Sequence, residues 1–88
     1  MASYKLVITK SAQKDIRKLP KPEINRIDKK IKSLRIIPRP FGCEKLKGSK
    51  SSYRIRVGDY RIIYTIYDKK LIISVIKVGH RRDIYKKS

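Results

Sequence analysis

The chain has little of what disulfide-linked, metal-binding and membrane proteins rely on: one cysteine, one histidine, no tryptophan and only seven acidic residues among 88. Cys43 alone cannot form an intramolecular disulfide, so nothing calls for an oxidising compartment. The acidic residues are scattered, and no spacing indicates a metal site or a catalytic carboxylate pair. The longest apolar runs, such as residues 71–73, are too short to span a bilayer, and the N-terminus lacks a signal peptide's apolar stretch. We therefore expect a cytoplasmic protein without membrane contact, metal or cofactor.

Positive charge is what the sequence has in excess. Twenty-five lysines and arginines give a net charge of +18, and such self-repulsion weakens the thin core of so short a chain. A polyanionic partner would compensate for the repulsion, and nucleic acid is the commonest one. An anionic membrane or an acidic protein is the competing partner. The length predicts a single domain over residues 1–88.

The apolar pattern predicts an α+β fold with the element order βααβββ. Alternating apolar residues indicate strands, and apolar residues at helical spacing indicate two helices, the first with Ser11 as its N-cap and Pro20 at its end. The short connections between the last three strands require antiparallel hairpins, which predicts a twisted, mainly antiparallel four-stranded sheet with the helical hairpin on one face. The expected strands are residues 4–9, 53–57, 59 or 60 to 67, and 70–78, and the expected helices are residues 11–19 and 22–34.

The turn at Gly58 and Asp59 sets the register of the first hairpin. A two-residue loop with glycine first pairs Val57 with Tyr60, and counting outward places Arg56 opposite Arg61. One face of this hairpin is then apolar and the other cationic. For the next hairpin the apolar pattern favours pairing of Tyr67 with Lys70, which puts Leu71 beside Ile66 in the core. Tyr60 and Tyr64 fall on the core side, whereas Tyr67 is available for base stacking.

Two arginines facing each other across a strand pair are an anomaly, because like charges in that position are destabilising. Arg54 lies on the same face, and the chain after Gly79 brings Arg81 to the same end of the sheet. A bound polyanion would remove the conflict between these charges. The alternative is that the long side chains simply extend into water.

Several segments together resemble the RelE family of the RelE/ParE superfamily. They are residues 45–48 (KLKG), 53–56 (YRIR), 58–64 (GDYRIIY), 78–81 (VGHR) and 83–85 (DIY). The resemblance covers essentially the whole chain and agrees with the βααβββ order. It implies a toxin of a type II toxin–antitoxin system that inhibits translation by cleaving mRNA in the ribosomal A site. It also implies a cognate antitoxin, small, acidic and RelB-like, that holds the enzyme inactive.

The same resemblance implies a set of site residues. In RelE-type cleavage the RNA's own 2′-hydroxyl is the nucleophile, so neither metal nor cofactor is required. Lysines stand in the family where this chain has Arg54 and Arg56, and arginine does not act as a base, so the general base stays open between charge assistance by Arg56, Tyr85 and a ribosomal group. The implied catalytic residues are Arg54, Arg56, Arg61, Arg81 and Tyr85, and the implied RNA-binding residues are Lys45, Lys47, His80 and Arg82.

Other functions remain open from the sequence. A ParE-like toxin would share the fold but inhibit DNA gyrase and cut no RNA, and a plain RNA-binding protein would grip phosphates without chemistry. His80 has the titration range of a catalytic acid or base, but two-histidine cleavage needs a second histidine and the chain has none. We therefore expect His80 to orient the turn that follows it.

Overall fold

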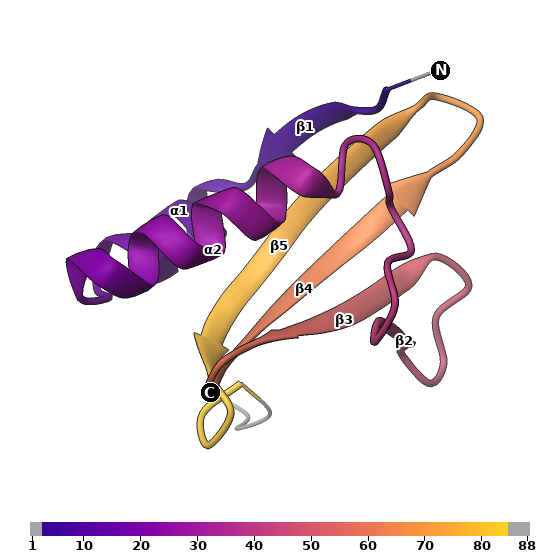
Figure 1. Cartoon of the computed structure of the whole chain (residues 1–88). Coiled ribbons are helices and arrows are strands. Elements are labelled where there is room, and N and C mark those ends of the chain that lie inside the picture. The colour runs from indigo at the N-terminus through magenta and orange to yellow at the C-terminus, as the bar shows by residue number, and fades with distance from the viewer. Residues whose placement is uncertain (1–2, 85–88) are drawn as a thin grey trace.

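The computed structural model describes residues 3–84, which form a five-stranded mixed sheet with two helices on one face (Figure 1). The strand order is β1-β5-β4-β3-β2, and within residues 3–84 no helix covers the opposite face. Among the helices described, none is long and apolar enough to cross a bilayer. The α+β class agrees with the expectation from sequence, and the element order differs from the expected βααβββ by one additional short strand after the helices. In chain order the elements are β1 (Lys5–Ile8), α1 (Lys10–Arg17), α2 (Lys21–Ser33), β2 (Glu44–Lys45), β3 (Ser52–Val57), β4 (Tyr60–Tyr67) and β5 (Ile72–His80).

The first helix starts earlier than its sequence predicts. Thr9, not Ser11, is the N-cap: its backbone is extended and its Oγ1 accepts a hydrogen bond from the Ala12 N–H at 3.2 Å. Because β1 ends at Ile8, Thr9 is the first residue that combines extended geometry with a capping hydroxyl. The prediction of Ser11 was wrong because serine and threonine both cap well and only the end of the strand decides between them.

The core lies between the helices and one face of the sheet. The second helix buries Ile27 and Ile31, and its C-cap buries Leu34, against sheet residues such as Ile62 and Tyr64. Tyr64 is fully buried, and its hydroxyl donates to the Pro38 carbonyl at 2.7 Å, which satisfies the one polar atom it brings inside. Tyr60 is half-buried against the same core. The core-facing placement of both tyrosines is confirmed.

The β3–β4 hairpin has the predicted register. Val57 pairs with Tyr60, Arg56 with Arg61 and Tyr53 with Tyr64. Gly58, in the turn, has a φ of 59°, a backbone conformation that glycine adopts without strain. The face assignment of every hairpin residue therefore follows from this two-residue turn.

The β4–β5 register was predicted incorrectly. Tyr67 pairs with Ile72 rather than Lys70, because residues 68–71 form a wider turn that ends with Leu71 at a φ of 54°. Leu71 is 40% exposed, outside the core. The register shifts again at Ile63 and Tyr64, and the strand continues to His80, beyond its predicted end at Val78. Up to Val75 the shift by two residues keeps each side chain on the same face, so the apolar pattern could not reveal the error there.

Two edge strands complete the sheet. At one edge β1 pairs in parallel with residues Ile72 to Val75 of β5, and beyond that point the Asp15 carboxylate accepts from the Val78 N–H at 3.1 Å. At the other edge the two residues of β2, expected in a loop, pair with Tyr53 and Arg54. The sheet therefore has five strands rather than the predicted four, and within residues 3–84 no strand pairs with β3 beyond Arg54 on that side.

Candidate functional site

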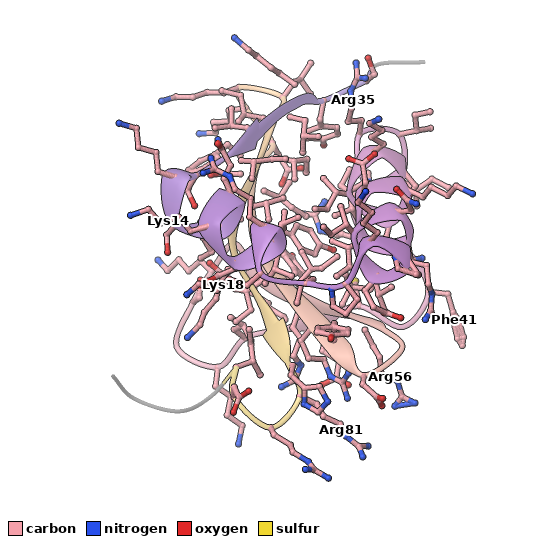
Figure 2. All side chains as sticks on the ribbon, turned by 90° about the vertical axis from the view of Figure 1, so that its left-hand side faces the viewer. Lys14, Lys18, Arg35, Phe41, Arg56 and Arg81 are labelled. Atoms are coloured by element: carbon pink, nitrogen blue, oxygen red, sulfur yellow. The ribbon has the colours of Figure 1, made fainter. Side chains whose placement is uncertain are left out.

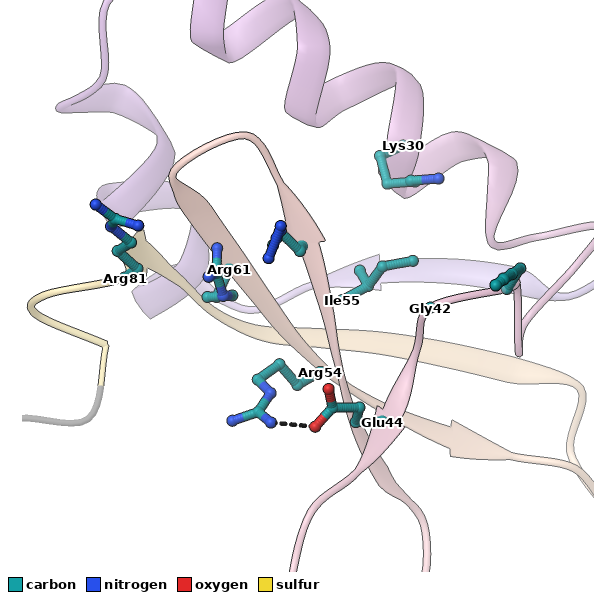
Figure 3. Close-up of a pocket in the computed structure, with 9 residues that line it drawn as sticks. Lys30, Gly42, Glu44, Arg54, Ile55, Arg61 and Arg81 are labelled. Carbon is teal, nitrogen blue, oxygen red and sulfur yellow. Dashed lines mark hydrogen bonds and ion pairs between the residues drawn. The ribbon is translucent and has the colours of Figure 1, made fainter.

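The hairpin β3–β4 places three arginines on the sheet face away from the helices. Arg54 and Arg56 alternate along β3, and Arg61 lies directly opposite Arg56 on β4. With Arg81 they line one cavity of about 460 Å³ at the end of the sheet, and we call these four residues the arginine cluster. Figure 3 shows Arg61 and Arg81 together near the end of the sheet, with Arg54 farther along β3.

Arg81 reaches the cavity because the chain after β5 is fastened to the hairpin turn. The Arg81 N–H donates to the Asp59 carbonyl at 2.7 Å, and its Nε lies 3.9 Å from Asp59 Oδ1. The turn closes on itself, since the N–H groups of Asp83 and Ile84 both donate to the His80 carbonyl. Ile84 is buried over Gly79, where an added Cβ would lie 3.1 Å from Ile84 Cδ1. These contacts hold residues 81–84 against the sheet.

The Arg61 guanidinium is oriented by backbone carbonyls. Its Nη1 donates to the Tyr60 carbonyl at 3.0 Å and to the Gly58 carbonyl at 3.3 Å. The Arg56 side chain, by contrast, is exposed, and its guanidinium has no hydrogen bond or ion pair with the described residues. Two guanidinium groups beside each other, one fixed and one available, suit a bidentate phosphate ligand.

The short strand β2 brings a carboxylate into this cationic site. Glu44 pairs in the ladder with Arg54, and its side chain forms an ion pair and hydrogen bond with the Arg54 guanidinium (Figure 3). Among the described residues that line the cavity, Glu44 is the only acid. The site therefore combines several permanent positive charges with one carboxylate that can accept a proton.

The remaining residues suggested by the sequence divide between the cavity and its surroundings. Lys45, Lys47 and Arg82 are exposed and do not line the cavity. His80 Nδ1 accepts from the Arg82 N–H at 3.1 Å, and the ring packs edge-on to Tyr60 at a centroid distance of 5.5 Å. These two contacts place His80 where it can orient the turn that follows it. Tyr85 lies outside the described residues.

Five of the nine lining residues were not predicted from the sequence as site residues. Glu44 stands immediately before the KLKG segment, and the preceding loop, rich in proline and glycine, was read only as a connection. The only available signal was an acidic side chain beside a family motif in a chain with few acids. Three of them have charged or aromatic side chains, Lys30, Phe41 and Glu44, and the other two are Gly42 and the buried core residue Ile55.

Comparison with known proteins identifies the family to which this chain is similar. The family model of the ParE toxin of the type II toxin–antitoxin system parDE matches residues 6–85. A RelE1 protein of Methanocaldococcus jannaschii is 31% identical over 86 residues, which cover 94% of this chain and 96% of that protein. The mRNA interferase toxin RelE of Escherichia coli is 32% identical over 81 residues, 90% of this chain and 84% of that protein.

A solved structure agrees with these sequence relatives. The archaeal RelE–RelB complex from Pyrococcus horikoshii contains a chain that superimposes with a TM-score of 0.81 at 32% identity, covering 92% of this chain and 98% of that one. The family model and the relatives each span nearly all of the sequence, and the fold is shared. This chain belongs to the RelE family of toxins, within the RelE/ParE superfamily of toxin–antitoxin proteins.

Proposed function

We propose that this toxin is a metal-independent endoribonuclease that cleaves mRNA in the ribosomal A site and so inhibits translation in the cytoplasm. The observation that carries the proposal is the arginine cluster, four guanidinium groups on one cavity at an open end of the sheet. The sequence relative from E. coli, named an mRNA interferase, supports the same reaction. A cavity lined by cations fits a phosphodiester, on which negative charge increases during cleavage.

The proposed reaction is the one that the family resemblance implies. The RNA 2′-oxygen attacks the adjacent phosphorus, the bond from phosphorus to the 5′-oxygen breaks, and the products are a 2′,3′-cyclic phosphate and a 5′-hydroxyl. Arg61 and Arg81 stabilise the pentacoordinate phosphate, and Arg56 adds charge beside them. Tyr85, as the family resemblance implies, would orient a base.

The proton of the 2′-hydroxyl needs an acceptor that arginine cannot be. Glu44 is the carboxylate that lines the cavity, so we propose it as the general base, with water supplying a proton to the leaving 5′-oxygen. Its ion pair with Arg54 holds the carboxylate at the edge of the site before RNA binds. Lys45, Lys47 and Arg82, exposed around the cavity, would contact flanking phosphates, and His80 would hold the turn that carries Arg82.

The proposed partners are the ribosome with its mRNA and a cognate antitoxin. The solved relatives include RelE–RelB complexes, in which a RelB antitoxin is bound to the toxin. A chain with a net charge of +18 should attract a small acidic antitoxin of the RelB kind, whose carboxylates would compete with phosphate for the arginine cluster.

The test is primer extension on an mRNA translated in a purified system with added toxin. Wild-type toxin should produce cuts within A-site codons, and Arg61→Ala should reduce the cleavage rate by at least a hundredfold, because a principal phosphate-stabilising charge is lost. Lys14→Ala removes an exposed charge on α1, away from the cavity, and should cut normally. Unchanged cleavage by Arg61→Ala would refute the proposal.

A second function is favoured by one observation, the match of the ParE toxin model to residues 6–85. A ParE-like toxin would inhibit DNA gyrase instead of cutting RNA. A gyrase supercoiling assay run beside the translation assay separates the two: inhibition of supercoiling without mRNA cuts would replace the endoribonuclease proposal.

A further inference from the structure

Phe41 is the most exposed of the large apolar side chains described, with 93% of its surface accessible. It lines the same cavity as the arginine cluster. Figure 2 shows it projecting outward on the side of the molecule where Arg56 lies, away from Lys14 and Lys18 of the first helix. An aromatic ring held in water contributes nothing to the core, so its position needs another explanation.

The loop that carries Phe41 is braced on both sides. Before it, the Arg39 guanidinium binds both carboxylate oxygens of Asp68 at 2.8 and 3.3 Å and donates to the Tyr53 hydroxyl at 3.0 Å. After it, the Cys43 N–H donates to the Pro40 carbonyl at 3.1 Å, which closes the turn. The ring is therefore presented by an anchored turn, so little ordering is required when a ligand binds it.

We propose that Phe41 is a stacking platform for a base of the single-stranded RNA whose phosphates the arginine cluster binds. The inference rests on the proposed function for the identity of the polyanion. A basic groove combined with an exposed aromatic face is how proteins hold single-stranded nucleic acid without reading its sequence. Every base has a π-face, so the contact would add affinity at any codon.

The surroundings of Phe41 favour RNA over an apolar protein surface or a membrane. The charged neighbours along the cavity are Lys30 and the arginine cluster, partly offset by Glu44. An apolar partner that covered Phe41 would also cover these charges and leave them without water, whereas RNA supplies phosphates to them and a base to the ring.

Because the chain has no tryptophan, Phe41→Trp gives a single fluorescent reporter at the proposed contact. The probe is a 2′-O-methyl oligoribonucleotide of about ten nucleotides, which matches a single-strand binding site and cannot be cleaved because its nucleophile is blocked. Titration should quench the tryptophan emission as a base stacks on the ring. Ile37→Trp is the matched control, since Ile37 is 59% exposed in the same loop but does not line the cavity, and its emission should stay constant.

Affinity for the same oligonucleotide gives the second readout. Phe41→Leu, which keeps an apolar side chain without a π-face, should weaken binding about tenfold, and Phe41→Tyr should bind like wild type. Equal binding by Phe41→Leu would overturn the proposal. The proposal would also be overturned if the emission of Phe41→Trp did not change with the oligonucleotide but changed with anionic phospholipid vesicles or with an acidic antitoxin peptide. Binding is measured without cleavage, so quenching in a toxin that fails to cut mRNA would support stacking while rejecting the reaction.

Discussion

At the scale of single residues, Glu44 has two opposed effects on the site. Its carboxylate pairs with Arg54 and so reduces the positive charge available to a phosphate, yet it is the one acid among the described residues that line the cavity and is our proposed proton acceptor. A residue that only stabilised the fold would not produce opposite effects on binding and on reaction. Binding and cleavage therefore have to be measured separately.

We predict that Glu44→Gln binds uncleavable RNA more tightly but cleaves mRNA more slowly. Loss of the competing ion pair should raise affinity roughly twofold to fivefold, because exposed pairs contribute modestly. Loss of the proposed general base should lower the single-turnover cleavage rate by about 10² to 10⁴. Filter binding and single-turnover cleavage on ribosomes measure the two effects.

The matched control is Asp28→Asn, which also removes one negative charge but breaks an exposed pair with Lys32 on α2. It should leave both quantities near wild type. A Glu44→Gln toxin that cleaves at the normal rate would remove Glu44 from the reaction.

At the scale of elements, an exposed polar network joins three segments that are distant in sequence. Asp68, in the turn between β4 and β5, binds Arg39 from the loop after α2 and accepts from the Tyr4 hydroxyl at 2.8 Å. The Arg39 guanidinium also lies 5.2 Å from the centre of the Tyr53 ring. The network thus fixes the loop that carries Phe41 and leads into β2, where Glu44 lies.

Hydrogen bonds from Arg39, and secondarily from Tyr4, hold the pKa of Asp68 below its ordinary value. Because the folded-state pKa is lower than the unfolded one of about 3.9, this contribution to stability is present above pH 4 and is lost as the pH falls through the folded-state pKa. We predict that Asp68→Asn unfolds at a lower temperature than wild type at pH 7 and that the difference shrinks below pH 4. Thermal unfolding from pH 7 to pH 2 measures it.

Tyr4→Phe is the control for this network. It removes the weaker of the two contacts and keeps the pair with Arg39, so most of the pH dependence should remain. A constant difference between wild type and Asp68→Asn across the whole pH range would contradict the assignment.

The features of the fold that the sequence predicted correctly are those determined by residues close together in the chain. The two-residue turn at Gly58 fixed the β3–β4 register, and with it three members of the arginine cluster, because a turn of that length permits one pairing. The β4–β5 register depended on a wider turn and a register shift, and the period of two in the apolar pattern could not distinguish Lys70 from Ile72 as the partner of Tyr67. Glu44 was missed for a related reason, since a strand of two residues has no periodicity to detect.

At the scale of the whole molecule, the net charge of +18 and the arginine cluster predict different effects of losing a single cation on RNA binding. Charge spread evenly over the surface would attract RNA to every face, and each lost cation would weaken binding equally. Figure 2 shows that Lys14, Lys18 and Arg35 lie on other parts of the surface than Arg56 and Arg81. The cluster and the proposed flanking contacts Lys45, Lys47 and Arg82 should hold phosphates directly and release their counterions, whereas Lys14, Lys18 and Arg35 should not.

The salt dependence of binding separates these two contributions. For a single strand the slope of log K against log salt is about −0.7 for each phosphate neutralised, so the four arginines should contribute about −3 to the slope, and the proposed flanking contacts add to it. Arg56→Gln should make the slope shallower by about 0.7, whereas Lys14→Gln, which removes the same charge from α1, should leave it unchanged. Fluorescence anisotropy with the 2′-O-methyl oligonucleotide between roughly 50 and 200 mM salt spans the range where such contacts lose most affinity. Equal slopes for the two variants would mean that RNA binding depends on the overall charge of the protein rather than on the arginine cluster. The proposal that the cluster positions the phosphate that is cut would then be refuted.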